Sequence, residues 1–268
     1  MKTSRLKNIV IVILLLVNAF LLFLLLSRRA EELGASERRT EQLSTLFENS
    51  GIAFDRAQLP DGEMPPALLF ERDAAKETDF ASALLGKAES SDSGGGVSRF
   101  IGEYGSCSIR SGGTIDALVS RPVDDPEGFC SHLFKTFGYT ALSSHLSDGT
   151  GSVTGVRSVD GQLIFNAALT LTFSENSLTG VNGTFLSDLS SFNEGQRTDG
   201  IDAVDALVYF LDYCSVSGVV CTEVCGIDAG YLLPSSSSVP LHLQSVWRIS
   251  TDVSSYYVNC KNGEITRE

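Results

Sequence analysis

The sequence has few histidines and few basic residues, and both shortages limit what the protein does. The only histidines, His132, His145 and His242, are scattered along the 268 residues. No H-E-x-x-H, G-x-S-x-G or Walker A pattern occurs anywhere in the sequence. Lysine and arginine number 20 against 33 acidic residues, a formal charge of −13, which nucleic-acid phosphates would repel. We therefore expect neither an enzyme nor a nucleic-acid partner.

The absence of these motifs leaves one catalytic alternative. A Ser/His/Asp triad assembled from distant residues is recognised by its geometry, so a hydrolase is the alternative that motif searches leave. Hydrophobic residues make up 43% of the chain and charged residues 20%, which is ordinary for a folded protein. The length fits one large domain or two to three small ones.

The longest hydrophobic run lies at the N-terminus. Ile9 to Leu26 is an uncharged stretch of 18 residues, which as a helix is about 27 Å long, close to the roughly 30 Å of bilayer hydrocarbon. The run is longer than a signal-peptide core and exits into Ser27-Arg28-Arg29 without a convincing cleavage site, and no cysteine stands at its end for lipidation. The run predicts an uncleaved transmembrane signal anchor.

The flanks of this run predict its orientation. Three basic residues precede it without an acidic one, whereas the two arginines that follow it, Arg28 and Arg29, are trailed by glutamates. The positive-inside rule then places the N-terminus in the cytoplasm and the rest of the chain outside. We expect a single-pass protein of the cell membrane with an extracytoplasmic C-terminal part.

Asn18 is the one strongly polar residue well inside the run. One interpretation is that so apolar a segment simply tolerates it. The other is a hydrogen bond to a partner helix in the membrane, which stabilises association by about 0.6–2 kcal/mol. Asn18 is therefore a candidate contact to a transmembrane partner.

The most clearly patterned segment is 122–198. Asp125-Pro126 predicts the start of a helix and Gly138 its end. Strands are expected at 139–146, 151–159, 162–173 and 177–186. Asp160-Gly161 between two of them is a strong signal for a two-residue hairpin turn. A helix followed by antiparallel strands is the pattern.

The same pattern is weaker on both sides of this segment. Before it, we expect a stalk helix over 28–50 with a stripe of Leu43, Leu46 and Phe47. A short helix at 79–87, a loop at 90–96, and strands at 100–109 and 114–120 follow. After it, we expect a helix that begins at Asp199 or Asp202, then strands at 224–233, 245–251, 255–260 and 264–265.

These elements predict an α+β protein in which each unit packs a helix on an antiparallel β-sheet. The expected organisation is a cytoplasmic tail (1–8), the anchor (9–26), a stalk helix with a first α+β unit (27–121), a second unit (122–198) and a third (199–268).

The sequence contains six cysteines, an even number that permits disulfides outside the cytoplasm. Cys221 and Cys225 have the spacing of one zinc knuckle, but no second pair exists, so we expect no metal. Cys214 at a helix end is within reach of Cys221 across a turn, which makes this pair a candidate disulfide. Small buried thiols are the alternative. Nothing in the sequence points to a cofactor.

Both ends of the chain resemble a known family. Lys7–Ile13 and Asn18–Leu22 resemble the N-terminus of the YycI regulatory proteins of Gram-positive bacteria, which have a short basic tail and an N-x-F-L-L-like segment. Val246–Ile249, Tyr256–Asn259 and Asn262–Ile265 resemble the closing hairpin of YycI and of PepSY-type domains. The third unit is thus PepSY-like. The six cysteines and the serine-rich loops depart from the family.

The resemblance implies a regulator. YycI and its relative YycH are membrane-anchored, have outer parts built of small α+β units, and associate with a sensor histidine kinase that controls cell-wall metabolism. The implied partners are therefore such a kinase and a second anchored regulator, with Asn18 in the anchor as the matching polar contact. The alternative function is an anchored PepSY-like module that binds a peptide or wall fragment, or inhibits a protease.

Overall fold

The structure, a computed structural model, describes residues 17–18, 20–22, 37–60, 64–92, 94–191, 200–235 and 240–268. Of the predicted anchor Ile9–Leu26, residues 17–18 and 20–22 fall within these ranges and are helical. The remainder of the anchor and the tail 1–8 lie outside the described residues. Among the helices that the structure describes, none has the length and apolar character needed to cross a membrane.

The described chain combines helices with many strands, which confirms the α+β class. Besides the helical residues 17–18 and 20–22, the helical segments are 37–49, η1 (Arg56–Gln58), α2 (Ala74–Leu85), α3 (Pro126–Phe137) and α4 (Ala203–Ser217). The first strands are β1 (Ala53–Phe54), β2 (Leu68–Glu71), β3 (Glu89–Asp92), β4 (Val97–Gly102), β5 (Gly105–Arg110) and β6 (Thr114–Pro122). Then come β7 (Tyr139–Ser147), β8 (Thr150–Val159), β9 (Gln162–Ser174), β10 (Ser177–Thr184) and β11 (Asp188–Ser191). The last are β12 (Glu223–Leu232), β13 (Leu241–Thr251), β14 (Ser255–Asn259) and β15 (Ile265–Arg267).

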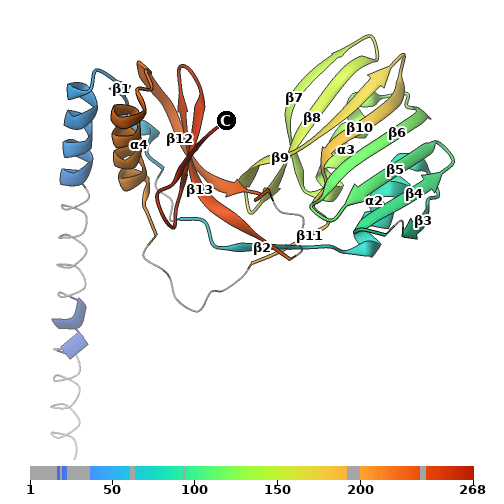
Figure 1. Cartoon of the computed structure of the whole chain (residues 1–268), viewed down its shortest axis with the longest axis horizontal. Helices are drawn as coiled ribbons and strands as arrows, with labels where there is room; N and C mark the ends of the chain where they lie inside the picture. Colours follow the sequence, from blue (N-terminus) through green and yellow to red (C-terminus); the bar gives the residue numbers. More distant parts are fainter. Residues whose placement is uncertain are drawn as a thin grey trace, which may run out of the picture.

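The strands are hydrogen-bonded in one continuous, mostly antiparallel array. Its main path is β11-β2-β13-β12-β9-β10-β6-β5-β4-β3. Strands β8 and then β7 extend from β9, and β14 and then β15 extend from β13. The parallel pairs are β1 with β12 and β12 with β9. Figure 1 shows that this array bends into two bodies that meet where β9 lies beside β12.

The first body, called here the α2/α3 body, comprises β3 to β10 with helices α2 and α3. Phe80 of α2 stacks on Phe185 with a ring-centroid distance of 4.0 Å and meets Phe137 of α3 edge-on at 4.9 Å. One hydrophobic cluster contains side chains of both helices and of β4, β5, β6, β8, β9 and β10. The two helices therefore cover the same face of the sheet, and their apolar stripes bury it.

The second body, called here the α4 body, comprises helix 37–49, α4 and the strands β12 to β15. Leu43 and Phe47 are 1% exposed and join a cluster with Phe210 of α4 and Trp247 of β13. Helix 37–49 therefore lies against α4, as Figure 1 shows. The third predicted member of its apolar stripe, Leu46, is 47% exposed, so the buried stripe is narrower than predicted.

A third cluster joins the two bodies. Phe70 of β2, Ile164 of β9 and Tyr231 of β12 are at most 1% exposed and pack together. The Tyr231 hydroxyl also donates a hydrogen bond to the carbonyl of Pro66 at 2.9 Å. The cluster of the α2/α3 body itself contains residues from both sides of position 121. The unit boundaries at 27–121, 122–198 and 199–268 stay a prediction.

Capping residues and a turn motif in the sequence correctly predicted where several elements begin or end. α3 begins after its N-cap Asp125 with Pro126 in the first turn, and ends at Gly138, whose φ of 72° is left-handed. Asp160 and Gly161 have φ values of 50° and 84°, as the predicted two-residue turn requires. α4 follows its N-cap Asp202, one of the two predicted starts.

Other predictions were wrong. The single strand expected at 100–109 is split, because β4 ends at Gly102 and β5 begins at Gly105. Both glycines are required there: a Cβ on Gly102 would lie 2.7 Å from Leu85, and one on Gly105, where φ is 144°, would lie 2.1 Å from the carbonyl oxygen of Leu118. The loop expected at 90–96 begins instead with strand β3, and α2 begins earlier than residue 79, behind its N-cap Asp73.

Candidate functional site

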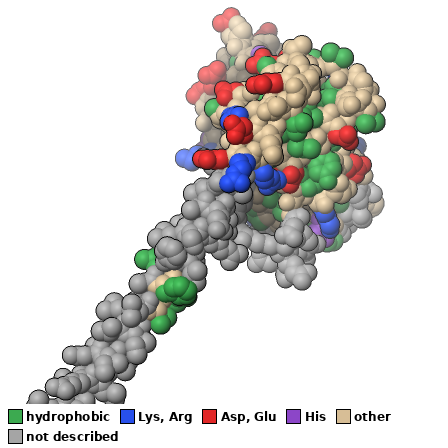
Figure 2. All heavy atoms as spheres, turned by 90° about the vertical axis from the view of Figure 1, so that its left-hand side faces the viewer, with side chains coloured by type: hydrophobic (Ala, Val, Ile, Leu, Met, Phe, Trp, Pro, Cys, Tyr) green, Lys and Arg blue, Asp and Glu red, His purple; other side chains and the backbone are tan. Residues whose placement is uncertain are grey.

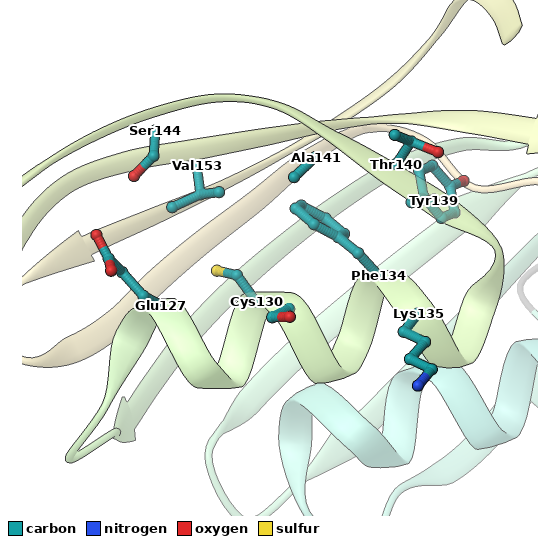
Figure 3. A pocket seen from close by; sticks show the side chains of 10 residues that line it. Glu127, Cys130, Phe134, Lys135, Tyr139, Thr140, Ala141, Ser144 and Val153 are labelled. Carbon is teal, nitrogen blue, oxygen red and sulfur yellow. The ribbon is translucent and has the colours of Figure 1, made fainter.

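The candidate site is a groove of about 470 Å³ between helix α3 and strands β7 and β8. In Figure 3 the helix side chains Glu127, Cys130 and Phe134 face Ala141 and Ser144 of β7 across the groove. The lining residues are Glu127, Cys130, Ser131, Phe134, Lys135, Tyr139, Thr140, Ala141, Ser144 and Val153. We call this space the α3–β7 groove.

The helix that forms one wall is fixed at both ends. The carboxylate of Asp125 accepts a hydrogen bond from the backbone N–H of Gly128 at 3.0 Å, which caps the first turn. At the other end, the guanidinium of Arg157 donates to the carbonyl of Gly138 at 2.6 Å. The i, i+3, i+4 spacing of Cys130, Leu133 and Phe134 turns these three side chains toward the sheet, where all are buried.

The hollow exists because small side chains face the helix. A register shift between Ala141 and Ser143 inserts an extra residue, Leu142, into β7. The shift brings Ala141 and Ser144 to the helix side, while Leu142 is 63% exposed. Below them, a Cβ on Gly155 of β8 would lie 2.9 Å from the Phe134 ring, so the glycine lets this ring lie close to the strand. Together these positions leave an apolar floor that is open above.

Strand β7 borders the groove as an edge strand. Among the strands that the structure describes, it pairs with β8 alone. An edge strand presents a row of backbone N–H and C=O groups to any chain that approaches it. The groove therefore combines an apolar floor with a free hydrogen-bonding edge, an arrangement suited to binding an extended polypeptide.

Tyr139 anchors one end of the groove. Its hydroxyl donates to the carbonyl of Thr184 at 2.6 Å and accepts from the backbone N–H of Leu186 at 3.3 Å. Burial raises the pKa of Tyr139 above its usual value, and burial lowers the pKa of the neighbouring Arg157, whose guanidinium lies 5.8 Å from the ring centroid. With its hydroxyl held by the backbone, Tyr139 supports the groove wall.

Cys130 is the one thiol among the residues that line the groove. Burial first, and then the carboxylates of Asp125 and Glu127, raise the pKa of its thiol to about 12. A thiol with that pKa stays protonated near neutral pH, and the protonated form is a poor nucleophile. Cys130 therefore contributes apolar surface to the groove.

The structure also places the residues predicted from the sequence. Asn18 is exposed on a helical segment, beside Val17, which is 52% exposed, and Phe20, which is 60% exposed; apolar side chains of this segment are visible at the surface in Figure 2. Cys214 at the end of α4 and Cys221 before β12 are both buried, in the same hydrophobic cluster, and the pKa of each thiol is raised, by burial first and for Cys214 also by the neighbouring Cys221. The disulfide itself stays a prediction.

The three histidines lie on different elements: His132 on α3, His145 on β7 and His242 on β13, all exposed. Within the described ranges, no group of three or more His, Cys, Asp or Glu residues is arranged to hold a metal ion. The groove was not predicted from the sequence. The signal that was available is the run of small residues on the strand, Ala141 and Ser144, opposite Cys130 and Ser131 on the helix.

The six thiols should differ sharply in reactivity. Cys225 is exposed and the other five are buried. Burial raises the pKa of Cys107, Cys130, Cys214 and Cys260 to about 12, and also raises that of Cys221. We expect iodoacetamide at about pH 8 to alkylate Cys225 first and the others only after denaturation, because the thiolate is the reactive form. Mass spectrometry of a labelling time course measures this.

One result would contradict that expectation, and a second experiment tests the candidate disulfide. Alkylation of Cys130 in the folded protein as fast as that of Cys225 would show that the groove thiol is neither buried nor protonated. Peptide mapping without reductant tests the candidate disulfide, because a bond between Cys214 and Cys221 would protect both from iodoacetamide after denaturation.

Comparisons with known proteins find similarity in structure only. No protein family profile matches the chain, and no curated protein matches its sequence. The chain is similar to the YpeB C-terminal domain of Bacillus megaterium, with 10% identity over 74% of this chain and 98% of that one, and a TM-score of 0.35. It is also similar to an uncharacterized protein from Eubacterium rectale, with 11% identity over 76% of this chain and 81% of that one, and a TM-score of 0.42. Neither likeness tests the resemblance to the YycI proteins, which stays a prediction.

Proposed function

We propose that the protein is a membrane-anchored, extracytoplasmic regulatory protein that works by binding another protein. The observation that carries the proposal is the α3–β7 groove, in which an open strand edge borders an apolar floor. Such an edge binds protein through backbone hydrogen bonds and selects side chains by the neighbouring pocket. The apolar run Ile9–Leu26 supports the membrane anchor.

The partner that we propose is a sensor histidine kinase of a two-component system that controls cell-wall homeostasis, together with a second anchored regulator. The resemblance of both chain ends to YycI supports this choice, as does the layout of helices on antiparallel sheets, which we propose to be YycI-like and PepSY-like. Asn18 supports contact within the bilayer, because its helical segment presents it at the surface beside exposed apolar side chains.

An exchange of the anchor tests this function. Replacing residues 9–26 with an unrelated apolar helix of equal length should abolish regulation while the protein stays in the membrane fraction. A coupling free energy of about 1–3 kcal/mol between the protein and the kinase is sufficient for regulation. A reporter gene driven by the response regulator gives the readout, and membrane fractionation with an antibody shows that the protein is still anchored.

Asn18→Leu is the matched single variant. It keeps the helix apolar and removes the polar contact, so we expect partial loss of regulation, in line with about 0.6–2 kcal/mol for one interhelical hydrogen bond. Full regulation by the protein with the exchanged anchor would refute a function that depends on contact between membrane helices.

The groove also favours a second candidate: an anchored PepSY-like module that binds a peptide or inhibits a protease. In that case the contact with the ligand lies entirely in the α2/α3 body, which contains the groove. The same exchanged-anchor protein separates the two candidates. It would keep its ligand binding or protease inhibition under the second function, and would lose its effect on the kinase under the first.

A further inference from the structure

We propose that the occupant of the α3–β7 groove is an extended basic segment of a protein partner, which pairs with the edge of β7 and inserts an apolar side chain above Phe134. The inference rests on the proposed binding function and specifies the chemistry of the partner. Three features of the groove determine it: the part of the edge that is regular, the apolar floor, and the charge at one end.

The regular part of the edge begins after the bulge. From Ser143 to Ser147, β7 pairs with β8 in unbroken register, from Ser143 opposite Thr154 to Ser147 opposite Thr150. A bulge disturbs the ladder locally, so a new strand has regular backbone partners only beyond Leu142. At about 3.4 Å per residue, this stretch pairs with about five residues of a bound segment, and the apolar residue above Phe134 lies beyond them, beside the bulge at Ala141.

The floor selects an apolar side chain. Phe134 and Val153 are 2% and 5% exposed, and Ala141 is the small residue above them. The volume of about 470 Å³ lies at the lower end of the range of ligand sites, which runs from about 300 to 1,000 Å³. This is room for one or two side chains of a bound strand.

The charge at the end of this stretch is negative. Because β7 returns antiparallel to α3, the N-terminus of the helix lies beside the C-terminal half of the strand, and Figure 3 shows Glu127 next to Ser144. Asp124, Asp148 and Glu175 are exposed in the turns at the same end.

Backbone hydrogen bonds hold these turns together. The N–H of Val123 donates to the carbonyl of Asn176 at 2.8 Å, and the N–H of Asn176 donates to the carbonyl of Gly149 at 3.0 Å. The turns that carry the three carboxylates are therefore joined at one end of the groove. At the opposite end of the groove the lining side chain is Lys135. Charge complementarity therefore favours lysine or arginine beside Glu127.

The spacing of the groove predicts the spacing of the segment. Glu127 and Phe134 are seven helical residues apart, or about 10.5 Å along the axis. A strand covers that distance in about three residues, and side chains on one face recur every second residue. The basic residue should therefore stand two or four positions from the apolar residue.

The same charges disfavour a different kind of occupant, because an anionic lipid surface would be repelled by these carboxylates. A basic segment of another protein is the occupant that the charges favour.

Peptide binding to the full chain in non-ionic detergent micelles tests the proposal. The probe is a fluorescent peptide in which threonine and valine alternate, with two lysines at one end. The first control peptide has glutamates in place of the lysines, and the second has N-methylated backbone amides. We expect the lysine peptide to bind about tenfold more tightly than either control, and more weakly as salt is raised.

Substitutions inside and outside the groove test whether the peptide binds there. Ala141→Trp fills the space and should reduce affinity for the lysine peptide about tenfold or more. Leu118→Trp is the matched control, because Leu118 is 74% exposed on β6 and does not line the groove, so its affinity should be unchanged. Glu127→Lys should reduce or reverse the preference for lysine over glutamate. Thermal unfolding shows that each variant is folded.

Several outcomes overturn the proposal: equal affinity for the lysine and glutamate peptides, no saturable binding, or unchanged binding by Ala141→Trp. If Ala141→Trp instead alters the mass of the protein in sedimentation, a second copy occupies the groove and the inference is wrong. A protein that regulates the kinase but binds no peptide refutes this inference alone. A protein that binds the lysine peptide but shows no regulation refutes the proposed function alone.

Discussion

Replacing Arg72 with methionine is expected to lower the free energy of unfolding by about 3–5 kcal/mol. The side chain of Glu77 in α2 is 3% exposed, and Arg72 is its partner. Nε donates to Oε1 at 2.7 Å and Nη2 donates to Oε2 at 2.6 Å, which is a bidentate pair. The methionine would fill much of the space but leave a buried carboxylate without this partner, and the cost of that desolvated charge is large. Urea denaturation followed by circular dichroism measures the loss.

The same guanidinium also connects α2 to β4. It donates to the carbonyl of Gly96 at 2.8 Å and to the hydroxyl of Ser98 at 2.9 Å. Arg72→Lys keeps the charge but loses the planar fork, so we expect a smaller loss than with methionine. The double variant Arg72→Met/Glu77→Leu removes both charges and should recover much of the stability, because the cost comes from leaving one charge alone.

Arg39→Met provides the matched control at the surface. Arg39 pairs with Asp202 and Asp205 at 3.0 and 2.7 Å, but all three side chains are about half exposed. Exposed pairs contribute about 0–1 kcal/mol because water screens them. If Arg72→Met costs no more than Arg39→Met, the buried pair is not a main source of stability in the α2/α3 body.

Features that depend on neighbouring residues were predicted from the sequence, whereas features that depend on contacts between distant residues were not. Asp125, Pro126 and Gly138 determine the backbone conformation only within a few residues of their own positions. They therefore predicted the start and the end of α3 correctly. The turn at Asp160-Gly161 is equally local. By contrast, the split between β4 and β5 depends on Gly105 passing the carbonyl of Leu118, a residue on another strand. The two residues lie on different strands, so the sequence pattern around either one does not reveal this contact.

The groove was missed for the same reason. Whether β7 is an edge or a central strand depends on the strand order, which joins elements that are far apart in the chain. The helix side of Ala141 and Ser144 depends on a bulge, and a shift of one residue moves every following side chain to the other face. The proximity of Cys214 and Cys221 was predictable because only one turn separates the two residues, whereas a disulfide between them stays a prediction.

The second large effect is expected at Trp247, the only tryptophan of the chain. Trp247 is 1% exposed in the cluster of the α4 body, and its strand β13 lies between β12 and β14 there. Trp247→Ala should lower the free energy of unfolding by about 3–5 kcal/mol, because the lost apolar contacts and the remaining cavity both destabilise the core. Circular dichroism in urea is the suitable measurement, since the variant has no tryptophan fluorescence.

Val216→Ala is the control for this variant. Val216 is 80% exposed on α4, and surface substitutions usually change stability by less than about 0.5 kcal/mol. A loss below about 1 kcal/mol for Trp247→Ala would mean that the core of the α4 body does not depend on the indole.

Trp247→Phe separates packing from hydrogen bonding. The indole Nε1 donates to the carbonyl of Ile201 at 2.8 Å, and the N–H of Ile201 donates to the carbonyl of Cys260 at 2.8 Å. Phenylalanine keeps an aromatic ring but leaves the Ile201 carbonyl without its donor, which costs about 1–3 kcal/mol. An equal loss in both variants would assign the stabilisation to the hydrogen bond. A smaller loss with phenylalanine would assign most of it to packing, and would show that the Val246–Ile249 motif, on which the resemblance to YycI partly rests, contributes to folding through Trp247.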